Sequence, residues 1–198
     1  MALAQDEAFA RIRLLRSPNI GPISYRQLIA RFGDAVRALE ALPDLASRKG
    51  GAYALAPADR VSREIEAVRK AGARYLFIGS PDYPPLLAEL EAAPPILTYR
   101  GDPALLALPA IAVVGARNAS AGAVKLARDF ALALAEAGHV VVSGLARGID
   151  GAAHQGALAG SARGQGRTIG VIASGIDIAY PPEHAKLQER IAEEALLL

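Results

Sequence analysis

The 198-residue sequence contains no cysteine and no tryptophan, and it has only three histidines. Without cysteine, neither a disulfide framework nor a cysteine-based zinc site can form, and the cytoplasm is the default location. His139, His154 and His184 lie apart in the chain, so we expect no metal site and no catalytic triad. Aromatic residues make up 5% of the chain, which leaves few side chains for stacking on nucleic-acid bases.

The chain also lacks a long apolar run and a strong charge imbalance. Charged residues at Asp6, Glu7, Arg11 and Arg13 interrupt the N-terminus, which is therefore neither a signal peptide nor a membrane span. The net charge is only +2, so any nucleic-acid binding must depend on a local site. Hydrophobic residues, at 52%, are sufficient for a core, and the length predicts one full domain with a small companion.

The first part of the chain has helical periodicity. Residues 7–42 and 59–71 place apolar side chains at helical spacing, and 75–78 is a strand candidate. The break at 19–22 (NIGP) resembles the hairpin of a helix-hairpin-helix or SAM-like module, but a plain turn between packed helices is the favoured interpretation. We expect a small helical domain over 1–78, followed by a Pro-rich linker over 79–108.

Beyond Pro109 the pattern alternates between strands and helices. This alternation predicts an α/β domain over 109–198, with a Rossmann-like parallel sheet and helical crossovers. The expected strands are 111–114, 140–142 and 168–172, and the expected helices follow Ser120 and cover 150–159 and 182–196.

Two expectations concern packing in this domain. The helix after Ser120 is expected to bury Ala123, Ala127, Phe130, Ala131 and Leu134. A fourth strand begins at 196–198, where the chain stops. We expect the C-terminal strands of the sheet to be missing, which would leave an apolar edge unless a partner covers it.

Ligands of such sheets bind beyond the carboxyl ends of the strands, which directs attention to the loops 115–120, 143–150 and 173–181. Each loop combines glycine, a small hydroxyl residue and, in most cases, a helix start whose free amides favour an anion. Arg117 and Arg147 add forked donors suited to phosphate, although pairing with Asp150 or Asp177 is an alternative role. The sequence predicts a phosphate pocket formed by Arg117 and the amides of Gly115 and Gly144.

The absence of two nucleotide-binding motifs limits which phosphate compounds could bind in this pocket. The sequence has neither the Gly-x-Gly-x-x-Gly fingerprint with its acidic partner nor a Walker-type loop, so we expect no NAD, ATP or other cofactor. Ser143 and Ser174 lack a nucleophile elbow, Asp150 is expected to cap a helix, and His154 to be a core histidine. We therefore predict binding of a nucleic-acid backbone and no enzymatic activity.

Three segments together resemble the DprA/Smf family of DNA-processing proteins. They are 113–117 (VVGAR), 143–150 (SGLARGID) with Ala153 and His154, and 168–181, and the linker from Tyr83 to Gly101 is also similar. The resemblance implies a SAM-like domain and a Rossmann domain that binds single-stranded DNA. It also implies protection of incoming DNA and loading of RecA in natural transformation, by a protein that forms homodimers at full length.

The resemblance also extends the predicted site. The expected DNA- or phosphate-binding residues are Gly115, Arg117, Ser120, Gly122, Ser143, Gly144, Arg147 and Gly148. The residues expected to shape the pocket are Asp150, His154, Gly175, Tyr180 and Pro181.

The chain departs from the family pattern at several positions. Ala116 replaces a common hydroxyl residue, and Pro182 and Ala185 stand where many members carry Lys and an aromatic. The family strands that contribute to self-association lie beyond Leu198, which leaves dimerisation of this chain open.

Two alternative functions remain. A nucleotide-monophosphate hydrolase related to lysine decarboxylases would need a Pro-Gly-Gly-x-Gly-Thr loop and a downstream Glu, and neither occurs here. A protein-interaction module would act through the N-terminal helices.

Overall fold

A computed structural model describes residues 3–47, 53–160 and 167–198. The chain divides into two compact units, the first comprising 1–70 with 75–97 and the second 71–74 with 98–198. Within the described ranges, no helix has the length and apolarity needed to cross a membrane.

The first unit is a small helical bundle. Tyr25 and Leu14 are fully buried in one of its clusters, and Ile12 and Val61 are buried in a second cluster. The turn between the first two helices has Asn19 at a φ of +60°, and Pro22 occupies the first turn of the second helix, where its missing N–H costs nothing. The elements are α1 (Gln5–Arg16), α2 (Pro22–Phe32), α3 (Ala35–Ser47), α4 (Ala58–Lys70), β1 (Arg74–Phe77) and α5 (Pro85–Ala88).

Much of the Pro-rich segment 79–108 has regular structure. It contains α5, the strand β2 (Ile96–Gly101) and a short 3-10 helix, η1 (Pro103–Ala107). Tyr83 is buried, and its hydroxyl donates to the Pro94 carbonyl at 2.7 Å. Residues 79–97 therefore pack as part of the first unit.

The second unit is built on a mixed sheet, and it confirms the predicted Rossmann-like α/β fold. Strands β3 to β6 are mutually parallel, whereas β2 is antiparallel to β6. The described strands are hydrogen-bonded in the order β1-β2-β6-β5-β4-β3. The elements are β3 (Ala110–Ala112), α6 (Ala121–Glu136), β4 (Val140–Ser143), α7 (Ile149–Ala159), β5 (Thr168–Gly170), η3 (Pro182–His184), α8 (Ala185–Glu194) and β6 (Leu196–Leu197).

The prediction of an open apolar edge at 196–198 is wrong. Strand β6 has a neighbour on each side, because Leu196 pairs with Ile169 of β5 and Leu197 pairs with Arg100 of β2. Leu196 and Leu197 are consequently fully buried. Periodicity within the last strand could not show that an earlier segment returns to pair with it.

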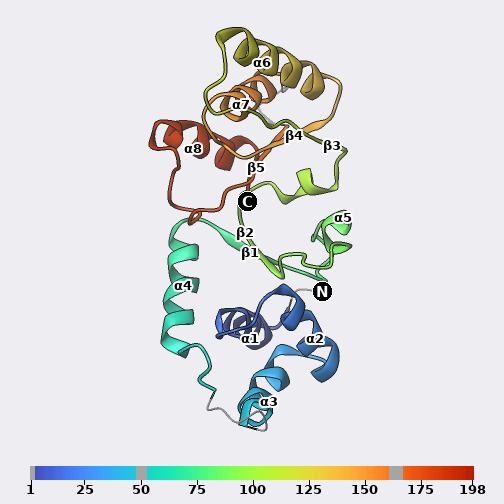
Figure 1. Ribbon diagram of the computed structural model, residues 1–198, viewed down its shortest axis with the longest axis vertical. Helices are drawn as coiled ribbons and strands as arrows, with labels where there is room; N and C mark the ends of the chain where they lie inside the picture. Colours follow the sequence, from blue (N-terminus) through green and yellow to red (C-terminus); the bar gives the residue numbers. More distant parts are fainter. Residues whose placement is uncertain (1–2, 48–52, 161–166) are drawn as a thin grey trace. The chain divides into compact units, whose positions relative to one another are not determined.

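Helices α6, α7 and α8 cover the same face of the sheet (Figure 1). Val141 of β4 packs in the cluster formed with α6 and α7, and its partner in the register of β5 is Thr168. Gly170, two residues further along β5, faces Ile191 of α8. Successive right-handed crossovers that advance in one direction place their helices on one side, as observed.

The burial of α6 differs from the prediction at Phe130. This side chain is 54% exposed, whereas the buried stripe consists of Ala127, Ala131 and Ala135. Gly156 of α7 lies directly against the backbone of Arg128, so α6 and α7 approach closely. Only small side chains fit between helices at such a distance, which explains why alanines rather than the phenylalanine are buried.

Candidate functional site

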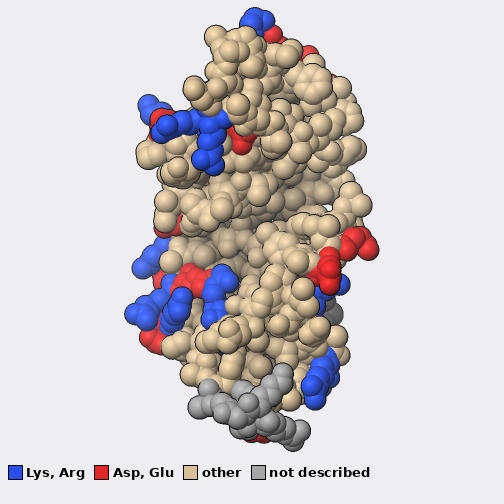
Figure 2. Space-filling view, in the orientation of Figure 1, with Lys and Arg blue, Asp and Glu red and all other residues tan. Residues whose placement is uncertain are grey.

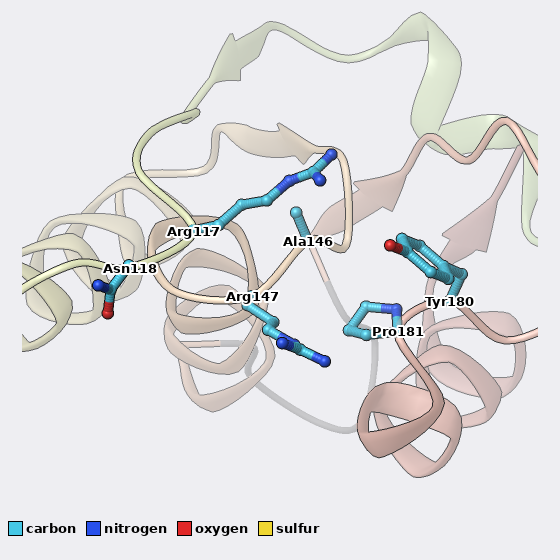
Figure 3. Close-up of a pocket in the computed structure, with 6 residues that line it drawn as sticks. All are labelled: Arg117, Asn118, Ala146, Arg147, Tyr180 and Pro181. Carbon is cyan, nitrogen blue, oxygen red and sulfur yellow. The ribbon is translucent and has the colours of Figure 1, made fainter.

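The loops that follow β3, β4 and β5 surround a hollow of about 280 Å³. Arg117 and Arg147 extend from the first two loops toward the side on which Tyr180 and Pro181 lie (Figure 3). The lining residues are Arg117, Asn118, Ala146, Arg147, Tyr180 and Pro181. The structure thus brings together four of the predicted site residues at the carboxyl edge of the strands.

The two arginines of this hollow, which we call the arginine pocket, have different partners. Arg117 is exposed, and no hydrogen bond or ion pair of its side chain is found within the described ranges. Arg147 forms an ion pair with Glu183, not with Asp150 or Asp177. Arg117 is therefore the cation available to an anion in the free protein.

Asp150 links the loop after β3 to the loop after β4 through hydrogen bonds. Its carboxylate accepts hydrogen bonds from the amide of Gly115 at 3.4 Å and from the amide of Gly144 at 3.2 Å. The prediction that these amides face a bound anion is therefore wrong, because a carboxylate of the protein already occupies them. Asp150 holds the loop after β4, as expected. It does so from the first turn of α7 and not as the N-cap, which is Gly148.

Glycines in these loops permit contact between protein segments. A Cβ on Gly148, which has a φ of +72°, would collide with the carbonyl oxygen of Ala116, and one on Gly115 would lie 2.7 Å from Ile149 Cγ1. Both positions require glycine because the neighbouring loop or helix occupies the space. The structure thus provides a packing role for them in place of close approach to a ligand.

Other predicted residues have structural partners or lie outside the lining of the pocket. Ser143 is buried, and its hydroxyl donates to the Val113 carbonyl at 2.7 Å, so its predicted contact with phosphate is not available in this structure. Ser120 caps α6 by accepting from the Ala123 amide at 3.3 Å. Gly122 and Gly175 are exposed, in the first turn of α6 and the loop after β5.

His154 is a core residue, as predicted. It is fully buried, and its Nδ1 lies 2.8 Å from the Thr168 hydroxyl oxygen. Burial lowers the pKa of His154 from 6.5 to about 4, against an opposing effect of the Ser143 backbone. The ring is consequently neutral at pH 7, and it links α7 to Thr168 of β5.

This buried histidine predicts a loss of stability in mild acid. Below pH 6.5 the unfolded chain binds a proton that folded His154 does not take up until about pH 4, so the free energy of unfolding falls across this window. At pH 4.5 the expected loss is about 2–3 kcal/mol relative to pH 7. Urea unfolding of the parent and of His154→Gln at both pH values measures it. Equal losses in the two proteins would contradict the assignment.

Sequence reasoning missed three residues at or beside the arginine pocket. Asn118 and Ala146 line it, and both stand next to a predicted arginine. Glu183 belongs to the turn after Pro181, and no motif indicated that its carboxylate reaches Arg147. Their proximity in the chain to Arg117 and Arg147 could have indicated the first two, whereas no sequence signal could have indicated Glu183.

Charge is not concentrated elsewhere on the visible surface. Figure 2 shows Lys and Arg side chains interspersed with Asp and Glu, without a continuous basic band. On the face that Figure 2 shows, no broad positive surface is available to an anionic ligand, whereas the arginine pocket offers a local cationic hollow.

A Rossmann-like sheet with an arginine pocket at its carboxyl edge, preceded in the chain by a helical unit, defines the class of this α/β protein. The family model for DNA recombination-mediator protein A matches residues 74–198, and that for the DprA-like N-terminal HHH domain matches 5–67. The chain belongs to this DprA/Smf family.

Individual relatives agree with this assignment. Protein Smf from Synechocystis sp. is 37% identical over 138 residues, which cover 68% of this chain and 34% of the relative. The X-ray structure of DNA processing protein A from Streptococcus pneumoniae aligns with a TM-score of 0.70 at 28% identity, over 100% of this chain and 67% of that one.

A second solved structure is that of DNA processing protein A from Helicobacter pylori, described for its single-stranded DNA binding mode. It aligns with a TM-score of 0.54 at 29% identity, over 64% of this chain and 55% of the other. The chain spans 34% to 46% of the length of the first curated relatives that it matches.

Proposed function

We propose that this chain binds single-stranded DNA through the arginine pocket and acts as a recombination mediator, not as an enzyme. The observation that carries the proposal is the convergence of Arg117 and Arg147 on one hollow beyond the strand ends. Guanidinium groups donate forked hydrogen bonds that match phosphate oxygens. Tyr180, which is exposed beside them, offers an aromatic face to a base.

The comparison with the Helicobacter pylori protein supports the choice of a single strand, because that relative is described by this binding mode. In this chain the arginine pocket is small, and residues of three loops line it. A flexible single strand can bend so that each arginine of such a hollow contacts a phosphate and a base lies beside them. A stiff duplex has its phosphates on a regular outer surface and its bases stacked inside.

A salt titration of binding tests this proposal. A labelled single strand and its duplex are titrated with the chain, and the dissociation constants are followed by fluorescence anisotropy at several salt concentrations. If each arginine neutralises one phosphate, the logarithm of the association constant K for the single strand falls with the logarithm of the salt concentration, with a slope of about −1.4 or steeper. Binding that is independent of salt, or equally tight for the duplex, would exclude the proposal.

The proposed role of the chain after it has bound DNA rests on its membership of the DprA/Smf family. We infer that the bound strand is protected and then passed to RecA during natural transformation. The direct measurement is the rate at which RecA assembles on a single strand with and without this chain. An unchanged rate, with DNA binding intact, would limit the chain to binding alone.

A further inference from the structure

Glu183 gives the arginine pocket an acidic group that the sequence did not indicate. Its carboxylate forms an ion pair with Nε of Arg147, and it follows the lining residue Pro181 by only two positions. Its own backbone amide and the Arg147 guanidinium hold the pKa of Glu183 below its usual range. The carboxylate is therefore charged at neutral pH.

The backbone that carries Glu183 is anchored to the loop that carries Arg147. His184 Nδ1 donates to the carbonyl of Leu145 at 2.8 Å, and Leu145 stands two residues before Arg147. The same histidine ring packs against Gly151 of α7, where an added Cβ would lie 2.6 Å from the ring. Pro181, on the other side of Glu183, is buried. These contacts hold the backbone of Glu183 beside the loop that carries Arg147, while its side chain stays free to move.

The ion pair itself is open to solvent. The Arg147 side chain is 63% exposed and that of Glu183 49% exposed, so water and salt screen their attraction. An exposed carboxylate is easily replaced by another anion, and a guanidinium edge that binds Glu183 cannot bind a phosphate at the same time.

We propose that Glu183 competes with the DNA phosphate for Arg147 and so sets the affinity of the arginine pocket. In the free protein the carboxylate pairs with Nε of Arg147, and a single strand gains this edge of the second arginine only by displacing it. Arg117, which has no such partner within the described ranges, makes the first contact. The inference rests on the proposed function of the pocket, and it assigns Glu183 a positioning role through Arg147.

Substitution of Glu183 tests the competition. Glu183→Gln keeps the size of the side chain and removes its charge, and it is expected to tighten binding of a labelled oligothymidylate about two- to five-fold at fixed salt, as for loss of an exposed ion pair. In an Arg147→Ala background the same substitution is expected to change binding little. Dissociation constants of the parent, both single variants and the double variant complete the cycle.

Glu136→Gln is the matched control. It removes the same charge from the last residue of the 16-residue helix α6, about 24 Å along the helix axis from its start. Its affinity is expected to equal that of the parent. A similar gain in this control would show a general charge effect and would overturn the proposal.

The remaining outcomes separate the two levels of inference. If Glu183→Gln leaves the affinity unchanged, or tightens binding equally with and without Arg147, competition is excluded while the pocket remains a binding site. If the parent does not bind the strand, or if loss of Arg117 has no effect on binding, the proposed function fails and the competition fails with it.

Discussion

Replacement of Arg117 by alanine is expected to weaken the binding of a single strand at least about ten-fold at fixed salt. Hydrogen bonds to charged groups contribute about 1.5–3 kcal/mol, and 1.4 kcal/mol corresponds to ten-fold in affinity. Because Arg117 has no side-chain partner within the described ranges, its loss removes a ligand contact without disturbing an internal one. The slope of log K against log salt should also become shallower by about 0.7. Both quantities come from the same anisotropy titration.

Two further variants distinguish a specific contact from a change of total charge. Arg117→Lys retains the charge but loses the forked geometry, so we expect an affinity between those of the parent and the alanine variant. Arg128→Ala removes an exposed arginine from the middle of α6 and is expected to bind like the parent. If Arg128→Ala and Arg117→Ala weaken binding equally, or neither does so, Arg117 has no special role.

Gly156→Ala is expected to reduce the free energy of unfolding by about 3 kcal/mol, the upper part of the usual range for overpacking. The added Cβ would collide with the carbonyl oxygen of Arg128, which is backbone and cannot move without shifting α6. The alanine stripe of α6 would then lose its contact with α7. Urea unfolding monitored by circular dichroism measures the loss.

Gly122→Ala serves as the comparison for this prediction. Gly122 is also helical, in the first turn of α6, but a Cβ there meets nothing within 4 Å. Alanine is the better helix former, so this variant should equal the parent or exceed it by up to about 1 kcal/mol. Parent-like stability of Gly156→Ala would show that the two helices can separate at little cost.

The predicted elements of the second unit are largely those of the structure. The helix expected after Ser120 begins at Ala121 with Ser120 as its side-chain cap, and the helix expected over 150–159 is α7. Local signals sufficed here because caps, glycines and periodicity act within a few residues. The helix expected over 182–196 is shorter, since the 3-10 turn η3 precedes α8.

The location of the candidate site could be predicted from the sequence, but the contacts within it could not. The rule that ligands lie beyond parallel strands correctly located Arg117, Arg147, Tyr180 and Pro181 around one hollow. It could not show that Asp150 takes up the two loop amides or that Glu183 reaches Arg147. Those contacts join residues from different loops, and their partners depend on distances that only folding creates.

The sequence by itself determined the family, the alternation of strands and helices, and the arginine-bearing loops, because each is encoded by residues close together in the chain. Only the tertiary structure decided that β2 pairs with β6 and that Phe130 points outward. It also decided which cation of the arginine pocket is already paired. These outcomes depend on which distant segments compete for the same surface or the same donor, and a linear pattern contains no such distances.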